Sequence, residues 1–309
     1  MSLAPVSPPP GGQGPGPMPG ALVEALDLLL ARRAAGVLPG ERRAAGRGTG
    51  TELAQIRPYQ VGDDVRQLDA AASARTGYPH VREHVPERAL TTWLLLDLSA
   101  SMACGTGARL KSDVAAGVAE VVARLSVRRA GRVALLTFGA PVPRLLPPRG
   151  GRQALVALRR AVAAGVAPDG AAPPDDALAL GLRRIMRLAR GPGLVVVVSD
   201  FREAGGGLER PPWARALSAA TGRHDVLAVE IADPREAYLP DAGQLALVDP
   251  ETGSRLDVDS ASAELRRAFA SAELARRDAL KSWLRRARAR HVTLSTDVDW
   301  LRALGRSLR

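Results

Sequence analysis

Two short apolar runs, each followed at once by acidic and hydroxyl side chains, place the strongest constraint on how this chain can fold. The first is "TTWLLLDL" (residues 91–98), and the second is "GLVVVVSDF" (residues 193–201). A strand that is apolar on both faces is typical of the interior of a parallel sheet whose two faces are covered by helices. We therefore expect both runs to be central strands of such a sheet.

Helical and extended segments alternate from residue 91 to the end of the chain. The predicted helices span residues 109–131, 151–165, 175–191, 211–222 and 261–290, with a short closing helix, and the further predicted strands span residues 132–139, 141–148, 224–231 and 291–297. This alternation predicts an α/β fold with a doubly wound, mostly parallel, Rossmann-like sheet. Residues 243–259 interrupt it with two alternating segments around "DPETG", which predict an inserted β-hairpin.

Composition divides the chain into three predicted parts. Residues 1–20 are rich in proline and glycine and cannot form a packed core, so we expect this tail to be disordered. Residues 21–90 are predicted to hold a helix, over residues 21–35, and an irregular or β segment that contains the motif "GDD". Residues 91–309 form the predicted α/β domain.

The segment around "GDDVRQLD" (residues 62–69) interleaves carboxylates with guanidinium groups. The groups concerned are Asp63, Asp64 and Asp69, together with Arg57, Arg66 and Arg75. Ion pairs of this kind commonly order a segment that lacks periodic apolar residues, so we interpret the motif as structural. A ligand-binding cluster is the alternative.

The long helix predicted over residues 261–290 is rich in arginine. Its apolar residues recur at amphipathic spacing, which predicts that one face docks on the sheet and that the arginines form a solvated face. The residues expected on the docking face are Leu274, Ala275, Leu280, Trp283, Leu284 and Ala287.

The chain is strongly basic, with 43 Lys and Arg against 32 Asp and Glu and a formal net charge of +11. The last fifty residues alone hold twelve Lys and Arg against five Asp and Glu. Frequent Ala, Gly, Arg and Pro are typical of a GC-rich genome, so we interpret the charge first as an effect of codon composition. Binding of nucleic acid or of an acidic protein through the Arg-rich C-terminal face remains an alternative.

Cysteine content and hydropathy favour a cytoplasmic protein. Cys104 is the single cysteine, so no disulfide can form within the chain. No stretch approaches the roughly 18 to 20 consecutive apolar residues of a membrane span, and the first twenty residues have neither the basic nor the apolar region of a secretory signal. We therefore expect no membrane association.

Oxygen-bearing side chains follow both apolar runs at the point where each strand should end. Asp97, Ser99 and Ser101 follow the first run, and Ser199 and Asp200 follow the second. If the two strands are neighbours, these groups meet at the carboxyl edge of the sheet, where α/β proteins bind ligands. Carboxylate and hydroxyl oxygens suit Mg²⁺, Mn²⁺ or Ca²⁺ and are poor ligands for zinc. Water, or a carboxylate from another molecule, must complete the coordination.

Two simpler interpretations of these residues stand beside the metal site. Ser and Asp at a strand-to-helix turn often cap a helix, which would make Asp97, Ser99 and Ser101 structural. A hydrolase is the other: a metal held by Asp97 and Asp200 could support catalysis, but the sequence supplies no evident general base. The nucleophile motif G-x-S-x-G is absent as well. We therefore expect no catalysis from this loop.

These motifs resemble those of a known family. "DLSASM" with the later "VVVVSDF" resembles the metal-ion-dependent adhesion site of von Willebrand factor A domains, whose first element is D-x-S-x-S. "RPYQVGDDVRQLDAAASART", "VREHVPER" and "LPDAGQLALVDPETG" resemble the bacterial family known as "domain of unknown function 58", which is similar to such domains.

The resemblance implies a set of metal ligands and a kind of partner. It places ligation of Mg²⁺, Mn²⁺ or Ca²⁺ on Asp97, Ser99, Ser101 and Asp200, which would bind an Asp or Glu of a partner protein. Sites of this type usually take a threonine from an intermediate loop, but here that loop, residues 167–182, has neither Thr nor Ser. Asp175 or Asp176 is the candidate substitute.

The resemblance also implies a non-enzymatic interaction module, with an adaptor or chaperone-like role beside a MoxR-type AAA+ ATPase. The phosphate-binding motif G-x-x-x-x-G-K-[ST] does not occur, so we expect another chain to supply any ATP hydrolysis.

Overall fold

The computed structural model describes residues 52–85, 90–105, 109–128, 130–171, 173–202 and 210–307. Contacts divide the chain into two compact units, one within residues 34–89 and the other containing residues 90–309. The predicted disordered tail, residues 1–20, and the predicted helix over residues 21–35 lie outside the described residues.

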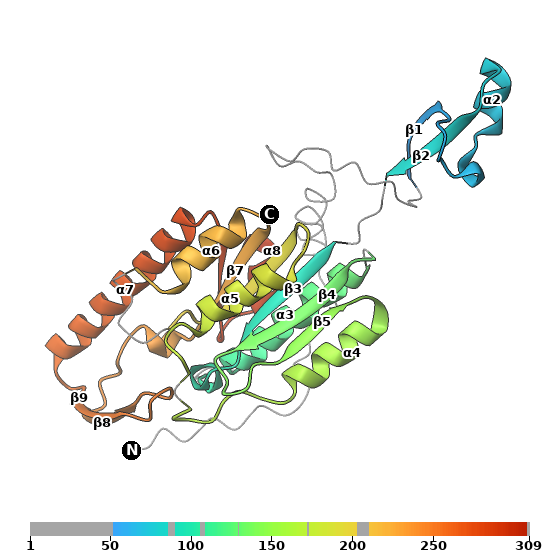
Figure 1. Ribbon diagram of the computed structural model, residues 1–309. Helices are drawn as coiled ribbons and strands as arrows, with labels where there is room; N and C mark the ends of the chain where they lie inside the picture. The colour runs from blue at the N-terminus through green and yellow to red at the C-terminus, as the bar shows by residue number, and fades with distance from the viewer. Residues whose placement is uncertain are drawn as a thin grey trace. The chain divides into compact units, whose positions relative to one another are not determined.

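A six-stranded sheet forms the centre of the larger unit (Figure 1). Its order is β10-β7-β6-β3-β4-β5, and all neighbouring strands are parallel except the edge strand β5, which is antiparallel to β4. The strands are β3 (Thr91–Asp97), β4 (Arg132–Phe138), β5 (Leu145–Arg149), β6 (Gly193–Ser199), β7 (Asp225–Ala232) and β10 (Arg290–Ser295). The predicted α/β fold with a doubly wound, mostly parallel sheet is confirmed, and the two apolar runs are its central pair.

Helices cover both faces of this sheet. Leu94 and Leu96 of β3 point to one face, where α3 (Lys111–Arg128), α4 (Gly151–Val162) and α8 (Trp300–Ser307) contribute to one buried apolar cluster. Trp93 and Leu95 point to the other face, toward α5 (Ala177–Leu188), α6 (Trp213–Thr221) and the end of α7 (Ala263–Arg286). Successive side chains of a strand point to opposite faces, and helices cover both faces here, so β3 is apolar throughout.

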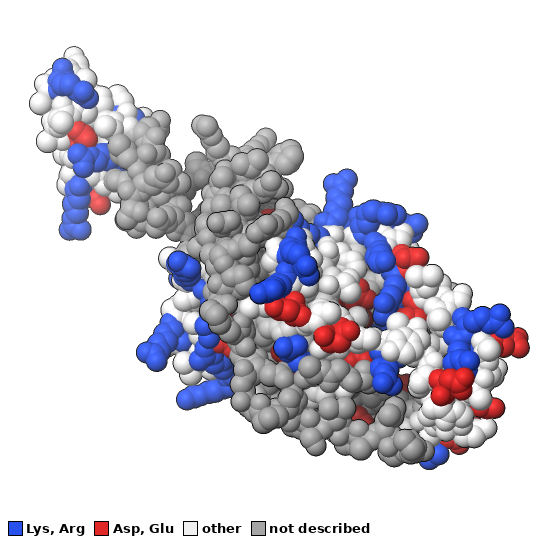
Figure 2. Space-filling model, turned by 180° about the vertical axis from the view of Figure 1, so that it is seen from behind, with Lys and Arg blue, Asp and Glu red and all other residues white. Residues whose placement is uncertain are grey.

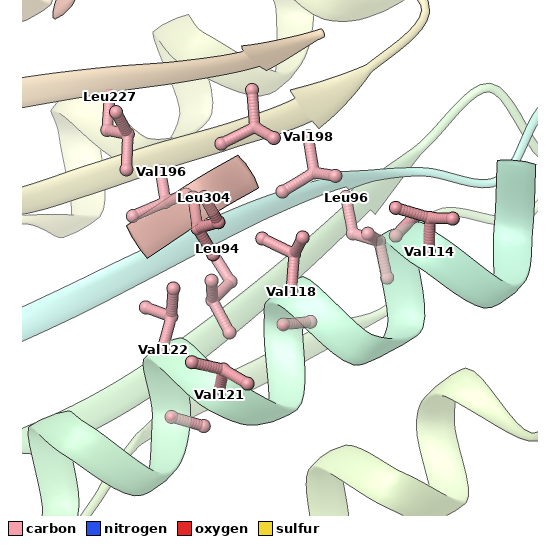
Figure 3. Packing of buried hydrophobic residues seen from close by; sticks show 14 of the residues in the cluster. Leu94, Leu96, Val114, Val118, Val121, Val122, Val196, Val198, Leu227 and Leu304 are labelled. Atoms are coloured by element: carbon pink, nitrogen blue, oxygen red, sulfur yellow. The ribbon is translucent and has the colours of Figure 1, made fainter. Parts of the chain in front are cut away.

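The packing of α3 on the sheet is shown in Figure 3. Val118 and Val122 of α3 approach Leu94 of β3 and Val196 of β6, all of them buried to 2% exposure or less. Burying a side chain of this size contributes roughly 1.5 to 3 kcal/mol. The central strands are therefore held rigidly, and the residues at their carboxyl ends are held with them.

The inserted hairpin is confirmed as a separate two-stranded sheet. It consists of β8 (Gln244–Val248) and β9 (Arg255–Asp259), which pair antiparallel in the register Gln244 to Asp259 through Val248 to Arg255. The turn "DPETG" connects the two strands, as the sequence predicts.

The predicted docking face of α7 is right toward the end of the helix, where Trp283 also packs against the buried cluster, and wrong at Leu274 and Ala275. Leu280, Leu284 and Ala287 are buried, but Leu274 is 62% exposed and Ala275 is exposed. The middle of the helix is held instead by Glu273, which is buried and pairs with Arg276 at 2.9 Å and with Arg277 at 2.8 Å.

The prediction that the α7 arginines form one solvated face is therefore also wrong at the middle of the helix. Arg276 is largely buried, since it pairs with Glu273 on its own helix and lies 3.7 Å from Glu230 of β7.

The smaller unit contains an antiparallel pair, β1 (Glu52–Pro58) and β2 (His80–Val85), with the short helix α2 (Ala70–Thr76). Arg57 donates two hydrogen bonds to Asp63, at 2.7 and 2.9 Å. Asp69 caps α2 by accepting from the Ala72 N–H and pairs with Arg82 at 2.7 Å. The structural interpretation of this motif is confirmed for Asp63 and Asp69.

The remaining carboxylate of the motif, Asp64, caps the 3₁₀ helix η1 (Val65–Gln67) by accepting a hydrogen bond from the Arg66 N–H at 3.0 Å. The arginine paired with Asp69 is Arg82, which the sequence did not single out.

Neighbouring residues of α7 test whether ion pairs anchor the helix. We expect Glu273→Ala to lower the free energy of unfolding by about 2 kcal/mol, because it leaves partly buried guanidinium groups without their carboxylate while solvent screens part of the loss. Leu274→Ala should change it by less than about 0.5 kcal/mol, since that side chain is mostly exposed. Urea unfolding measures both, and equal losses would contradict the assignment.

Candidate functional site

The predicted site residues converge at the carboxyl edge of the sheet. β3 and β6 are parallel neighbours in the register Leu96 to Val198. From β3 the sheet continues to β4 and β5, and from β6 it continues in the opposite direction to β7 and β10. Such a switch point is where open α/β sheets bind ligands. Asp97 ends β3 and Asp200 follows β6, so the two carboxylates lie at this point and both are buried.

Hydrogen bonds fix the Asp97 carboxylate among hydroxyl groups. Its Oδ1 accepts from the Ser99 N–H at 2.9 Å, and its Oδ2 accepts from the Ser199 hydroxyl at 2.5 Å. The Ser99 and Ser101 hydroxyl oxygens lie 3.2 Å apart. Ser99 occupies the N-cap of the 3₁₀ helix η2 (Ala100–Ala103) but makes no side-chain capping bond. Helix capping therefore does not account for the Ser99 hydroxyl.

Gly139, directly after β4, allows the backbone to approach this cluster. It has a φ of +77°, and a Cβ there would lie 2.6 Å from Asp97 Oδ1 and 2.8 Å from the Ser99 nitrogen. No side chain fits at such distances. The backbone after β4 can therefore lie against Asp97 only because residue 139 is glycine.

Lys111, at the start of α3, is a site residue that the sequence did not single out. Its side chain is fully buried, and its Nζ lies 2.6 Å from Asp200 Oδ2 and 2.6 Å from Glu236 Oε1. Burial alone would lower the pKa of Lys111, but the two carboxylates outweigh it and raise the pKa. Lys111 is one of only two lysines in this Arg-rich chain, which is the sequence signal that could have drawn attention to it.

The pKa values of the two aspartates move apart. Burial, and then the charge of Asp200, raise the pKa of Asp97 to about 7 against the hydrogen bonds from Ser199 and Ser99. Burial also acts to raise the pKa of Asp200, but Lys111 outweighs it and the pKa is lowered. The site therefore holds one carboxylate whose charge is balanced by Lys111 and one, Asp97, whose charge is not.

A chain of ion pairs leads from Lys111 toward the far edge of the sheet. Glu236 lies 3.3 Å from Arg202, and Arg202 lies 3.0 Å from Glu273 of α7. Arg276 continues the chain to Glu230, which pairs with His291 of β10 at 3.0 Å. Burial would raise the pKa values of Glu230 and Glu273, but the hydrogen bond with His291 lowers the pKa of Glu230 and the paired arginines lower that of Glu273.

The intermediate loop does not supply the predicted substitute ligand. Asp175 is exposed, and Asp176 pairs with Arg183 of α5 at 2.7 Å. The carboxylate that reaches the serine loop belongs instead to Glu251, in the turn of the β8–β9 hairpin. Its Oε1 accepts a hydrogen bond from the Ser101 N–H at 2.9 Å.

The second oxygen of Glu251, Oε2, is buried and has no hydrogen-bond partner among the described residues. Buried polar atoms almost always have a partner, so this oxygen marks a place where a cation or proton would be stabilised. In the sequence, "DPETG" predicts a turn and forms part of the family resemblance, but no local pattern indicates that Glu251 reaches the serine loop.

The donor set fits a hard divalent cation in its chemistry. The oxygens of Asp97, Ser99, Ser101 and Glu251 are of the type that Mg²⁺, Mn²⁺ and Ca²⁺ prefer, and the unbalanced charge of Asp97 favours a cation. Lys111 already engages one side of Asp200. Within the described ranges, no group of three or more His, Cys, Asp or Glu side chains is placed to hold a metal ion, so hydroxyl groups and water must supply ligands.

The unbalanced charge of Asp97 predicts a dependence of stability on pH in the metal-free protein. The pKa of Asp97 is raised from 3.8 to about 7, so its contribution to stability is full below about 3.8 and is lost as pH rises through about 7. In EDTA, we expect the free energy of unfolding of wild type relative to Asp97→Asn to fall across this range. Urea unfolding between pH 4.5 and 8 measures it, and parallel curves would contradict the expectation.

The two lysines provide a matched pair of variants. Lys111→Met leaves Asp200 and Glu236 without their shared cation, so we expect a loss of about 3 to 5 kcal/mol in the free energy of unfolding. Lys281→Met removes an exposed lysine that pairs with Asp278 at 3.4 Å and should cost less than about 1 kcal/mol. Similar losses in chemical unfolding would show that Lys111 does not balance the site.

Comparison with known proteins identifies relatives over most of the chain. A family model described as "Protein of unknown function DUF58" matches residues 55–279. The chain is 37% identical over 284 residues to "Uncharacterized protein Rv1480" of Mycobacterium tuberculosis, covering 91% of this chain and 86% of that protein. The predicted resemblance to the "domain of unknown function 58" family is confirmed.

Solved structures share a general likeness with this chain. The "conserved hypothetical protein BatB" of Bacteroides thetaiotaomicron aligns with a TM-score of 0.40 and 15% identity, covering 71% of this chain and 97% of that one. A "von Willebrand factor type A" structure from Catenulispora acidiphila aligns with a TM-score of 0.39 and 14% identity, covering 74% of this chain and 44% of that one. With scores below 0.5, nothing about the chemistry of this chain follows from these alignments.

Proposed function

The chain belongs to the family described as "Protein of unknown function DUF58", and we propose that it is a protein-interaction module that binds an acidic side chain of a partner through a divalent cation. The cation would be held by Asp97, Ser99 and Ser101, with Asp200 on the side away from Lys111. One observation carries the proposal: the buried carboxylate of Asp97 lies among hydroxyl groups without a balancing cation.

The same site already accommodates a carboxylate. The Ser101 N–H donates to Glu251, which supports the view that an acidic group can lie beside the serine loop. A divalent cation, when bound, would supply the positive charge that Asp97 lacks and leave coordination positions for an acidic side chain. The residues of this chain would then position the cation and keep the surrounding ligands ordered.

The proposed module is non-enzymatic, and its partner class comes from the family resemblance alone. That resemblance favours a MoxR-type AAA+ ATPase, which would supply the ATP hydrolysis that this chain has no phosphate-binding motif to perform. A cytoplasmic location is part of the same proposal. Among the described residues, no helix is both long enough and apolar enough to cross a bilayer.

Binding of nucleic acid through the Arg-rich C-terminal face is a weaker candidate. Arg276 and Arg277 pair with Glu273, and Arg266 pairs with Asp241, so these cations already have partners. On the face shown in Figure 2, acidic side chains lie among the basic ones. Phosphate binding would make affinity fall steeply with salt, which distinguishes it from the metal-dependent proposal.

Thermal unfolding tests the cation site. With Mg²⁺ or Mn²⁺ at about 100 times its Kd, binding should add roughly 2.7 kcal/mol and raise Tm by about 5 to 10 °C relative to EDTA. We expect Asp97→Ala to abolish the shift, because it removes the unbalanced carboxylate. Asp176→Ala, which alters a surface pair on α5, is the control and should keep it.

A wild-type Tm that does not respond to millimolar Mg²⁺ or Mn²⁺ would overturn the proposed cation site. An equal response in Asp97→Ala would place any cation elsewhere on the chain.

A further inference from the structure

We propose that Glu251 is an internal ligand of this site, and that an acidic partner binds by displacing it. The inference rests on the proposed function, since it concerns which carboxylate occupies the place offered to the partner. It assigns the β8–β9 hairpin the role of a competitor built into the chain.

The position of the Glu251 carboxylate carries the first step. Glu251 is 150 residues from Ser101 in sequence, yet its Oε1 lies 2.9 Å from the Ser101 nitrogen. The Ser101 hydroxyl belongs to the proposed ligand set and lies 3.2 Å from that of Ser99. The Glu251 carboxylate therefore lies against the backbone of the loop that carries the proposed ligands, and we assign to it the position that a partner's carboxylate would take.

The state of the second oxygen distinguishes an internal ligand from a merely structural contact. A carboxylate that only anchors a surface turn can leave its second oxygen in water, where solvation satisfies it. Glu251 Oε2 is instead buried, with no hydrogen-bond partner among the described residues. Burying such an oxygen is unfavourable unless a cation or proton accompanies it, and a cation held beside the serine loop would supply that partner.

The hairpin is built so that this ligand can be exchanged. A two-stranded sheet has marginal stability alone, and β8 and β9 pair with each other as a separate sheet. Val248 and Leu256 of this hairpin are 55% and 63% exposed, so little apolar burial holds it in place. The turn keeps a backbone anchor beside the contact between Ser101 and Glu251: the Gly170 N–H donates to the Pro250 carbonyl at 2.8 Å.

The turn presents Glu251 in a fixed direction. The Glu251 N–H donates to Asp249 Oδ1 at 3.0 Å, and the Gly253 N–H donates to the Asp249 carbonyl at 2.8 Å. Because the turn is preformed, Glu251 competes as a tethered group at high effective concentration. An external carboxylate must then bind to the fraction of molecules in which Glu251 is released, and its apparent affinity is lowered by that fraction.

The experiment uses Mn²⁺ as the cation and acetate as the external carboxylate. Water-proton relaxation of Mn²⁺ bound to the full chain reports how many waters the ion keeps, and titration with acetate reports a carboxylate that replaces one. The variants are Glu251→Ala and the near-isosteric Glu251→Gln. Asp257→Ala is the control, since it removes an acidic side chain from the same hairpin at an exposed pair with Arg255.

We expect protein-bound Mn²⁺ to keep more water in Glu251→Ala and Glu251→Gln than in wild type or Asp257→Ala. Acetate should bind the two Glu251 variants with a Kd at least about 10-fold lower, because a hydrogen bond to a charged group no longer competes. Thermal unfolding of each variant checks that it is folded.

The possible failures are distinguishable. If Asp97→Ala abolishes Mn²⁺ binding but wild type and the Glu251 variants match in relaxation and in acetate Kd, the internal-ligand inference is overturned while the cation site stands. If Mn²⁺ does not bind wild type, or binds Asp97→Ala equally, the proposed function fails and the inference fails with it.

Discussion

The structure depends on the burial of two carboxylates, Asp97 and Asp200, at the ends of neighbouring central strands. Two like charges that are removed from water repel each other, and each is costly unless a cation balances it. Lys111 balances Asp200 at 2.6 Å, while Asp97 is left with hydroxyl and N–H donors alone. This imbalance is what a cation would relieve.

Pairing of buried charges also connects the elements around the site. Lys111 is shared with Glu236, whose charge continues through Arg202 to Glu273 in the middle of α7. At this point α7 contacts the rest of the unit through ion pairs, while Leu274 faces solvent. Charge pairing therefore positions a segment that apolar packing does not reach.

The proposed site draws on three separate parts of the chain. The serine loop after β3 offers hydroxyl groups, the loop after β6 offers Asp200, and the β8–β9 turn brings Glu251. The first two are rigid because they end strands buried on both faces, whereas the third belongs to an exposed two-stranded sheet. A ligand on a weakly anchored hairpin can be replaced without disturbing the core.

Local patterns in the sequence determined the fold and the centre of the site. The unbroken apolar runs identify β3 and β6 as buried parallel strands, and the residues directly after them fix Asp97 and Asp200 at one sheet edge. Only the tertiary structure decided that Lys111 balances Asp200 and that Glu251, not Asp176, reaches the serine loop. Periodicity reports which face of an element is buried, but the partner of a charge depends on which distant segments folding brings together.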